Sequence, residues 1–228
     1  NGLDPQGFRS EDWIKNGRQG AFEVNNFTSP AFVARVNYHG VKGLRVGASF
    51  YYNQTAKNGT KPWRNTGYKF PVTIVTGDLQ YKGFNNNLIV RGNAVYGNLG
   101  ASGALTTINN SSSAASGYPN TTVAQNAVSY GGEAGYNIGS FFHSKAPRIY
   151  PFIRYEYYNP MEKAEANTGL LADKRFQVSA VTAGLNYYAL PNLVIKADYT
   201  HRSIGGGKYN DENLVSVGIA YIGWFIKK

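Results

Sequence analysis

The stretch from Val181 to Tyr199 constrains the fold most, because its apolar residues recur with a period of two on both sides of a turn. Before the turn, Val, Ala, Leu and Tyr alternate with Thr, Gly and Asn. After the corner at residues 190–192, Leu, Ile, Ala and Tyr lie opposite Lys196 and Asp198. Successive side chains of a strand point to opposite faces, so this stretch predicts a hairpin with one apolar and one hydrophilic, charged face. Its arms are close to the ~9–11 residues that a strand needs to cross a bilayer.

Two classes of protein contain such a hairpin. The apolar face carries Tyr187 near the end of the first arm and Tyr199 at the end of the second. Tyrosine is enriched where hydrocarbon gives way to water, so the hairpin is typical of a membrane-spanning β-barrel. A soluble β-sandwich also contains hairpins whose apolar side faces inward and whose polar side faces outward. The rest of the chain has to decide between the two.

The same alternation recurs along the chain and predicts about nine or ten strands in all. The other alternating segments are 31–39, 44–52, 70–82, 88–96, 128–138, 149–158 and 214–225, with a further short strand at 21–24. Short turns near positions 40, 84, 144 and 191 alternate with long connections near 60, 112, 166 and 206. Transmembrane barrels alternate short periplasmic turns with long extracellular loops, whereas a sandwich has no reason to do so.

The distribution of charge over the two faces favours the membrane barrel as well. In nearly every predicted strand the charged residues share a face with Gly, Ser, Thr and Asn. A soluble calyx-type barrel has an apolar interior, which is the reverse polarity. The sequence therefore predicts an all-β, antiparallel transmembrane β-barrel that forms one domain over residues 1–228.

Two segments outside the strands are predicted to lack regular structure. Residues 1–20 are polar without a clear period and are predicted to be a loop or an arm that enters the fold. Residues 98–127 are rich in Ser, Thr, Asn, Gly and Ala. Such a composition predicts a long, mobile extracellular loop that buries no core.

The charged face would line the lumen of a pore, where low-dielectric walls focus the field of each side chain on a passing ion. The predicted pore-lining residues are Arg35, Arg45, Asp78, Lys82, Arg91, Glu133, Arg154, Glu156, Lys196 and Asp198. The cations outnumber the anions in this set, and the whole chain has a net charge of +10, so both favour anionic solutes. The alternative for any one of these residues is that it is neutralised by a cross-strand ion pair. The residues predicted to face lipid include Val46, Phe50, Leu79, Tyr81, Ile153, Tyr155, Leu185, Ile195, Val217 and Ile219.

Other classes of function find little support. The chain has no cysteine, which excludes disulfides, zinc–thiolate sites and cysteine nucleophiles. Its histidines are His39, His143 and His201, and the only weak catalytic candidate is His201 near Asp211. No phosphate-binding, dinucleotide-binding or metal-ligand motif occurs. Aromatic residues alternate with aliphatic ones instead of interleaving with Lys and Arg, which argues against nucleic-acid binding. The sequence therefore predicts no enzyme, no cofactor, no metal and no nucleic-acid partner.

Four segments resemble the C-terminal part of the phosphate-selective porin O/P family, in particular the porins of Bacteroides-like bacteria. They are GLRVGASFYY (43–52), YPFIRYEYYNP (150–160), VTAGLNYYALPNLVIKADY (181–199) and LVSVGIAYIGWF (214–225). The resemblance covers most of the chain from Ala31 onward. It implies the C-terminal portion of a larger, sixteen-stranded barrel. It also implies a trimeric, passive diffusion channel of a Gram-negative outer membrane.

The predicted function is therefore an outer-membrane porin for small hydrophilic solutes that prefers anions, with phosphate-like anions as candidates. The expected partners are outer-membrane lipid and lipopolysaccharide, small anionic solutes, and further copies in a homotrimer or a larger envelope complex. An alternative stays open at this point. A small closed outer-membrane barrel with a structural or interaction role in an envelope assembly would have the same strand pattern.

Overall fold

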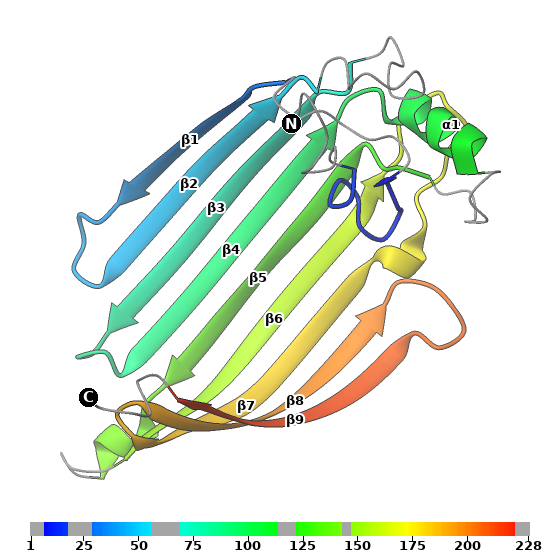
Figure 1. Cartoon of the computed structure of the whole chain (residues 1–228). Helices are drawn as coiled ribbons and strands as arrows, with labels where there is room; N and C mark the ends of the chain where they lie inside the picture. Colours follow the sequence, from blue (N-terminus) through cyan, green and yellow to red (C-terminus); the bar gives the residue numbers. More distant parts are fainter. Residues whose placement is uncertain (1–6, 18–28, 56–68, 114–121, 143–146, 222–228) are drawn as a thin grey trace, which may run out of the picture.

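Nine strands form one antiparallel sheet, and each strand pairs with its neighbours in the sequence, so the order is β1 to β9 without a crossover (Figure 1). This computed structural model describes residues 7–17, 29–55, 69–113, 122–142 and 147–221. The strands are β1 (Ala31–Tyr38), β2 (Leu44–Asn53), β3 (Val72–Gly83), β4 (Leu88–Leu99), β5 (Asn126–Tyr136), β6 (Arg148–Lys163), β7 (Val178–Leu190), β8 (Leu193–Ile204) and β9 (Asp211–Tyr221). Every long alternating segment of the sequence is thus a strand, and the all-β antiparallel prediction is confirmed. The short strand expected at 21–24 lies outside the described residues.

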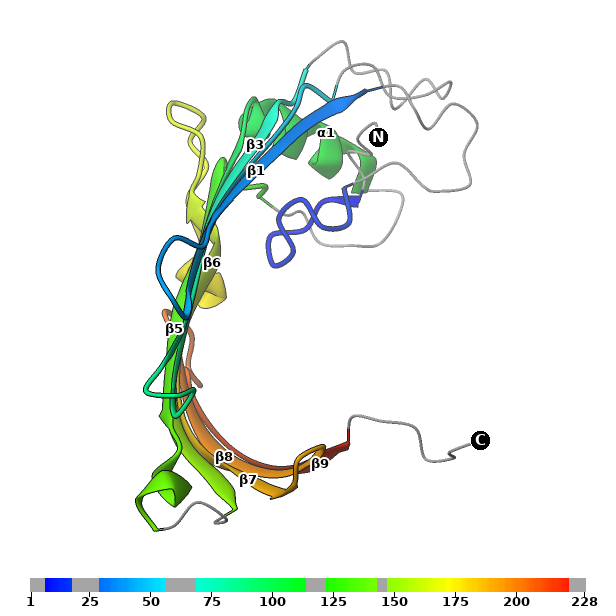
Figure 2. The ribbon, with the colours of Figure 1, turned by 90° about the vertical axis from the view of Figure 1, so that its left-hand side faces the viewer.

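The sheet bends into an arc, so that one face is concave and the other convex (Figure 2). Within the described residues the arc does not close, because β1 pairs only with β2 and β9 only with β8. Each strand runs antiparallel to the one before it, so the two edge strands β1 and β9 run in the same direction. No helix in the described part of the chain is long and apolar enough to span a membrane.

Tight turns connect strands at one end of the sheet. The β3–β4 turn places Phe84, Asn85 and Asn86 at positive φ (51°, 56° and 66°), a conformation that asparagine tolerates better than most residues. The β7–β8 turn is tighter still, since Leu190 and Leu193 pair directly across it. The β5–β6 connection contains the short 3-10 helix η3 (Ile138–Phe141). The structure confirms the turns expected near positions 84 and 191.

At the other end, the β8–β9 connection differs from the prediction. The sequence predicted a long loop near position 206, but β8 continues to Ile204 and β9 begins at Asp211, which leaves only residues 205–210. The polar residues that indicated a loop are in fact cross-strand partners. Arg202 lies opposite Glu212 and Ser203 opposite Asp211. The β6–β7 connection is longer, as expected, and contains the 3-10 helix η4 (Lys174–Phe176).

A small hydrophobic core lies at the same end of the sheet as these connections. The helix α1 (Ser102–Ser113) follows β4, and residues 7–17 lie inside the concave side of the sheet (Figure 2). Together with the ends of three strands they bury a cluster of apolar side chains. Its members are Phe8, Trp13, Phe70, Val72, Leu99, Leu105, Val123, Ala124 and Met161.

The prediction that residues 98–127 form a mobile loop without a core is therefore wrong for its described part. Leu105 and Val123 have no exposed surface, although the segment around them is polar. The reason is that the few apolar residues of the segment meet Phe8 and Trp13, which come from a distant part of the chain. Burial of each side chain of this size stabilises the folded state by roughly 1.5–3 kcal/mol.

Hydrogen bonds hold residues 7–17 in place. The indole of Trp13 donates to the carbonyl of Ala124 at 3.0 Å, and the Ser10 hydroxyl donates to the carbonyl of Thr122 at 2.8 Å. From α1, the Asn109 amide donates to the carbonyl of Phe8 at 2.9 Å. The described part of the arm expected at 1–20 is thus a fixed element of the concave side.

Candidate functional site

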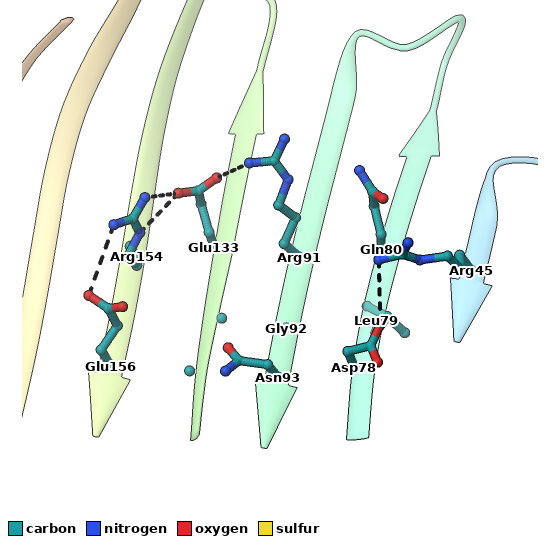
Figure 3. Close-up of a pocket in the computed structure, with 12 residues that line it drawn as sticks. Arg45, Asp78, Leu79, Gln80, Arg91, Gly92, Asn93, Glu133, Arg154 and Glu156 are labelled. Carbon is teal, nitrogen blue, oxygen red and sulfur yellow. Dashed lines mark hydrogen bonds and ion pairs between the residues drawn. The ribbon is translucent and has the colours of Figure 1, made fainter. Parts of the chain in front are cut away.

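All ten charged residues predicted to line a pore lie on strands and share the concave face. The cross-strand register fixes this arrangement, because Arg45 lies opposite Gln80, which lies opposite Arg91 on the next strand. The row continues from Arg91 through Glu133 to Arg154. Figure 3 shows these side chains projecting from successive strands toward one another. The concave face is therefore a continuous charged surface, and it is the candidate functional site.

The first group of charges on this face is centred on Asp78 of β3. Arg35 donates to Oδ2 of Asp78 at 2.7 Å, and Arg45 donates to Oδ1 at 3.4 Å. Arg35 also donates to the hydroxyl of Ser49 at 2.8 Å. Gly47 lies between the partners, and a Cβ there would stand 2.3 Å from Nη2 of Arg35 and 2.5 Å from Oδ2 of Asp78. A larger residue there would displace the ends of these two side chains.

The second group is centred on Glu133 of β5. Nε of Arg154 donates to Oε2 of Glu133 at 2.9 Å, while Nη1 of Arg91 lies 3.5 Å from Oε1 on the other side (Figure 3). Arg154 also lies 4.0 Å from the carboxylate of Glu156. Asp78 and Glu133 thus each hold two guanidinium groups. The Asp78 group keeps one excess positive charge, whereas Glu156 balances the Glu133 group. Because the arginines are about half exposed, each such ion pair stabilises the folded protein by at most about 1 kcal/mol. The main effect of the pairs is to fix the positions of the guanidinium groups on the concave face.

Three of the predicted residues have no ion-pair partner among the residues that the structure describes. They are Lys82, Lys196 and Asp198, which lie on the same face but beyond 4.0 Å of any opposite charge of the described residues. The alternative of neutralisation by ion pairs therefore divides the set. Seven of the predicted residues are in ion pairs, and these three form none within the described part of the chain.

Two adjoining cavities follow the charged face. The first, of about 380 Å³, is lined by Arg45, Asp78, Arg91, Glu133, Arg154 and Glu156 among others. The second, of about 520 Å³, shares Arg91, Glu133, Arg154 and Glu156 with the first and adds Lys196 and Asp198. The shared residues make the two cavities one trough along the concave face. Its guanidinium and ammonium groups can stabilise a hydrated anion without forming any covalent bond.

The structure adds an ion pair that the sequence did not indicate. Arg202 donates to Glu212 at 2.8 Å and to the hydroxyl of Tyr158 at 2.9 Å, and all three lie on the concave face. Both charged residues fell within the predicted loop near 206. The alternation of the strand could have indicated the position of Arg202. Even-numbered residues of β8, such as Lys196 and Asp198, lie on the concave face, and Arg202 continues this series.

The convex face carries the opposite chemistry. All ten residues predicted to face lipid lie on it, with Val217 and Ile219 exposed by 76% and 73%. The flanking Val215 of β9 is exposed by 75%. The ten charges predicted to line a pore and the ten side chains predicted to face lipid therefore lie on opposite faces, as the alternation predicted.

Histidines and carboxylates do not form a metal site in the described chain, where no group of three or more potential ligands occurs. His39 is exposed directly after β1, and His201 lies on the convex face, with Nε2 3.9 Å from Asp211. His143 lies outside the described residues.

Comparison with models of known protein families gives no match for this chain, and comparison with curated proteins gives none either.

Proposed function

We propose that this chain forms part of a transmembrane β-barrel of a bacterial outer membrane, and that the barrel is a porin. The observation that carries the proposal is the polarity of the curved sheet, with charges on its concave face and large apolar side chains exposed on its convex face. A water-filled lumen surrounded by lipid requires this polarity. A soluble sandwich or calyx requires an apolar side that is covered.

The exposed apolar surface supports the same proposal. It extends over successive strands, whereas soluble monomers rarely expose contiguous apolar patches larger than a few hundred Å². Tyrosines border this surface, as in the aromatic girdles of membrane barrels. Near the tight turns they are Tyr38, Tyr81, Tyr136, Tyr187 and Tyr221, and near the other end Tyr52, Tyr96, Tyr130, Tyr157 and Tyr199.

Strand direction shows that the nine described strands need further strands to close as an antiparallel barrel. Because β1 and β9 run in the same direction, joining them directly would create a parallel pair. Bacterial single-chain barrels of this class are antiparallel and have an even number of strands. An odd number of further strands would complete such a barrel. The sixteen-stranded barrel implied by the porin resemblance meets this condition with seven further strands, and a small ten-stranded barrel meets it with one. We propose the larger barrel on the resemblance, and strand direction is compatible with both.

Anion preference is proposed from the charges on the concave face. Asp78 and Glu133 are each shared by two arginines, and Lys82 and Lys196 have no ion pair with a described residue. With Glu156 and Asp198 counted as well, six cations stand against four anions among these ten residues, so the surface that a solute would pass has a small positive excess. Small hydrophilic anions, phosphate-like anions among them, are the solutes that this surface favours.

The test uses the protein reconstituted in planar lipid bilayers. Stepwise conductance, with a reversal potential under a KCl gradient whose sign shows anion selectivity, is the expected result. In membranes, Val217→Cys should resist a membrane-impermeant thiol reagent, and Asn93→Cys on the concave face should react with it. Ready labelling of the first variant would refute the membrane placement, and absence of conductance would refute the channel.

A further inference from the structure

A second polar cluster lies on the convex face, where β8 and β9 approach their connection. His201 and Ser203 are two residues apart on β8, so both project from this face. On β9, Asn213 lies directly opposite His201, and Asp211 lies directly opposite Ser203. The cluster is accessible, because the side chains of His201 and Asp211 are exposed by 48% and 57%. None of these residues belongs to the charged concave face.

The hydrogen bonds of Asn213 orient the imidazole of His201. Its Oδ1 lies 3.0 Å from Nδ1 of His201 and also accepts the hydroxyl of Tyr199 at 2.7 Å. An amide oxygen can only accept, so Nδ1 of His201 carries the proton in this arrangement. The lone pair of the neutral ring is then on Nε2, which lies 3.4 Å from Oγ of Ser203.

Ser203 has two acceptors within reach. Its hydroxyl donates to Oδ1 of Asp211 at 2.6 Å, and a rotation about the Cβ–Oγ bond would direct the same proton to Nε2 of His201. The Asp211 carboxylate also lies 3.9 Å from Nε2, where it would stabilise an imidazolium. A hydroxyl, a base within hydrogen-bond reach and a third group that orients the base are the parts of an activated serine nucleophile. Catalytic hydrogen bonds are often this long before substrate binds.

We propose that Ser203, His201 and Asn213 form a serine esterase site that acts on acyl esters of membrane lipids. The substrate class rests on the membrane placement under Proposed function. The outward side chains of β8 are apolar up to Tyr199, and those of β9 are apolar down to Val215. On both strands the polar cluster comes directly after the last apolar side chain of the convex face. In a membrane it would therefore lie where the hydrocarbon gives way to the lipid head groups. The ester carbonyls of lipids lie at that depth.

The reaction has two steps, and both are balanced without a cofactor. In the first, Oγ of Ser203 attacks the ester carbonyl carbon while Nε2 of His201 takes the hydroxyl proton. His201 then gives this proton to the leaving alcohol as the ester C–O bond breaks, which leaves an acyl group on Ser203. In the second step, water attacks the acyl carbon, its proton passes through Nε2, and a carboxylic acid and the free serine are released.

The test measures hydrolysis of p-nitrophenyl butyrate in detergent and of phosphatidylcholine vesicles, together with labelling by a fluorophosphonate. Ser203→Ala should abolish labelling and hydrolysis. Ser179→Ala is the matched control, because Ser179 lies opposite Ser203 on β7, and it should keep both. His201→Gln should reduce hydrolysis by about 10²–10⁴-fold. Asn213→Ala should reduce it as well, whereas Asn213→Asp, which keeps an acceptor for Nδ1, should restore it.

The outcomes separate this proposal from the channel. Absence of labelling in the wild-type protein, or equal activity of Ser203→Ala and wild type, would overturn the esterase. Cleavage of the soluble ester but not of the vesicles would overturn the lipid substrate. Conductance of Ser203→Ala should equal that of wild type, because Ser203 is not on the concave face. An esterase without conductance would refute the channel and leave the nucleophile established.

Discussion

Glu133→Gln tests the role of the concave face directly. The substitution replaces the carboxylate by an amide of the same size and so removes the negative charge with which Arg91 and Arg154 both pair. Glutamine keeps the size of the side chain and can still accept from Arg154, whose Nε lies 2.9 Å from Oε2 of Glu133. The guanidinium of Arg91, 3.5 Å away on the other side, loses its ionic partner. The face gains one positive charge with little change in shape. If it lines a lumen, selectivity must move further toward anions.

The size of this effect follows from Coulomb's law with screening. A unit charge about 5 Å from a permeating ion interacts with it by ~0.8 kcal/mol at the dielectric constant of water and by ~3 kcal/mol at an effective value of about 20. Arg91 is 57% exposed and Arg154 41% exposed, so the lower end applies. The added charge stabilises an anion and destabilises a cation by the same amount, so ~0.8 kcal/mol for each ion raises the ratio of anion to cation permeability by at most roughly 15-fold before screening by salt. Lys196→Gln removes a positive charge from the same face and should lower the ratio by a similar factor.

The assay is the reversal potential of reconstituted channels under a KCl gradient. The shift should be largest at low salt and should shrink at high salt, because the Debye length falls from ~10 Å at 0.1 M to ~3 Å at 1 M. Asp211→Asn is the control, since it changes the net charge of the chain equally but on the convex face. An unchanged reversal potential in Glu133→Gln, or an equal shift in Asp211→Asn, would refute the assignment of the concave face to the lumen.

Three further predictions concern stability. Leu105→Ala should lower the unfolding free energy by about 2–5 kcal/mol in a denaturant titration, because Leu105 is fully buried in the core at the end of the sheet. Gly47→Ala should displace the side-chain ends of Arg35 and Asp78 and lower the thermal midpoint slightly, since such a pair stabilises by at most about 1 kcal/mol, whereas Gly77→Ala, with nothing within 4 Å, should leave it unchanged. The hydrogen bonds from Arg175 lower the pKa of Asp173, so their stabilisation is complete above the ordinary pKa of aspartate, about 3.9, and is lost as the pH falls below it. Asp173→Asn should therefore unfold with less dependence on pH in that acidic range.

The strands and their faces could be predicted because a period of two depends only on local geometry. Once a strand exists, residues such as Lys196 and Asp198 must share a face, whatever the rest of the chain does. The composition of both faces followed from that rule alone. Which charges pair could not be predicted, since this depends on register. Arg91 meets Glu133 only because the connections between β4 and β5 set those two positions opposite each other.

The core at the end of the sheet escaped prediction for a different reason. Its burial comes from contacts between residues about a hundred positions apart, as between Phe8 and the Asn109 amide. A segment as polar as α1 carries too few apolar residues to bury itself, so composition alone indicated a loop. The cluster around His201 could be predicted only in part, because the sequence indicated His201 and Asp211 but not their neighbours Ser203 and Asn213. His201 and Ser203 have the spacing of one strand face, but Asn213 joins them only when β8 and β9 extend through the polar residues around their turn.

The chemistry of the two edges bears on what would complete the proposed barrel. Exposed edge strands are normally protected by charges, proline, bulges or a covering segment. Strand β1 carries Arg35 on its concave face, but its outward face, which is formed by Phe32, Ala34, Val36 and Tyr38, has neither charge nor proline, and every residue of the strand is exposed. A second copy cannot cover both edges in an antiparallel barrel without reversing its direction, because β1 and β9 run the same way. That reversal would place the core-bearing end of one copy beside the tight turns of the other, on opposite sides of a membrane. We therefore infer that the strands that pair with β1 and β9 are not copies of these nine. They should form an antiparallel set of odd number with the same alternation, apolar outside and polar inside.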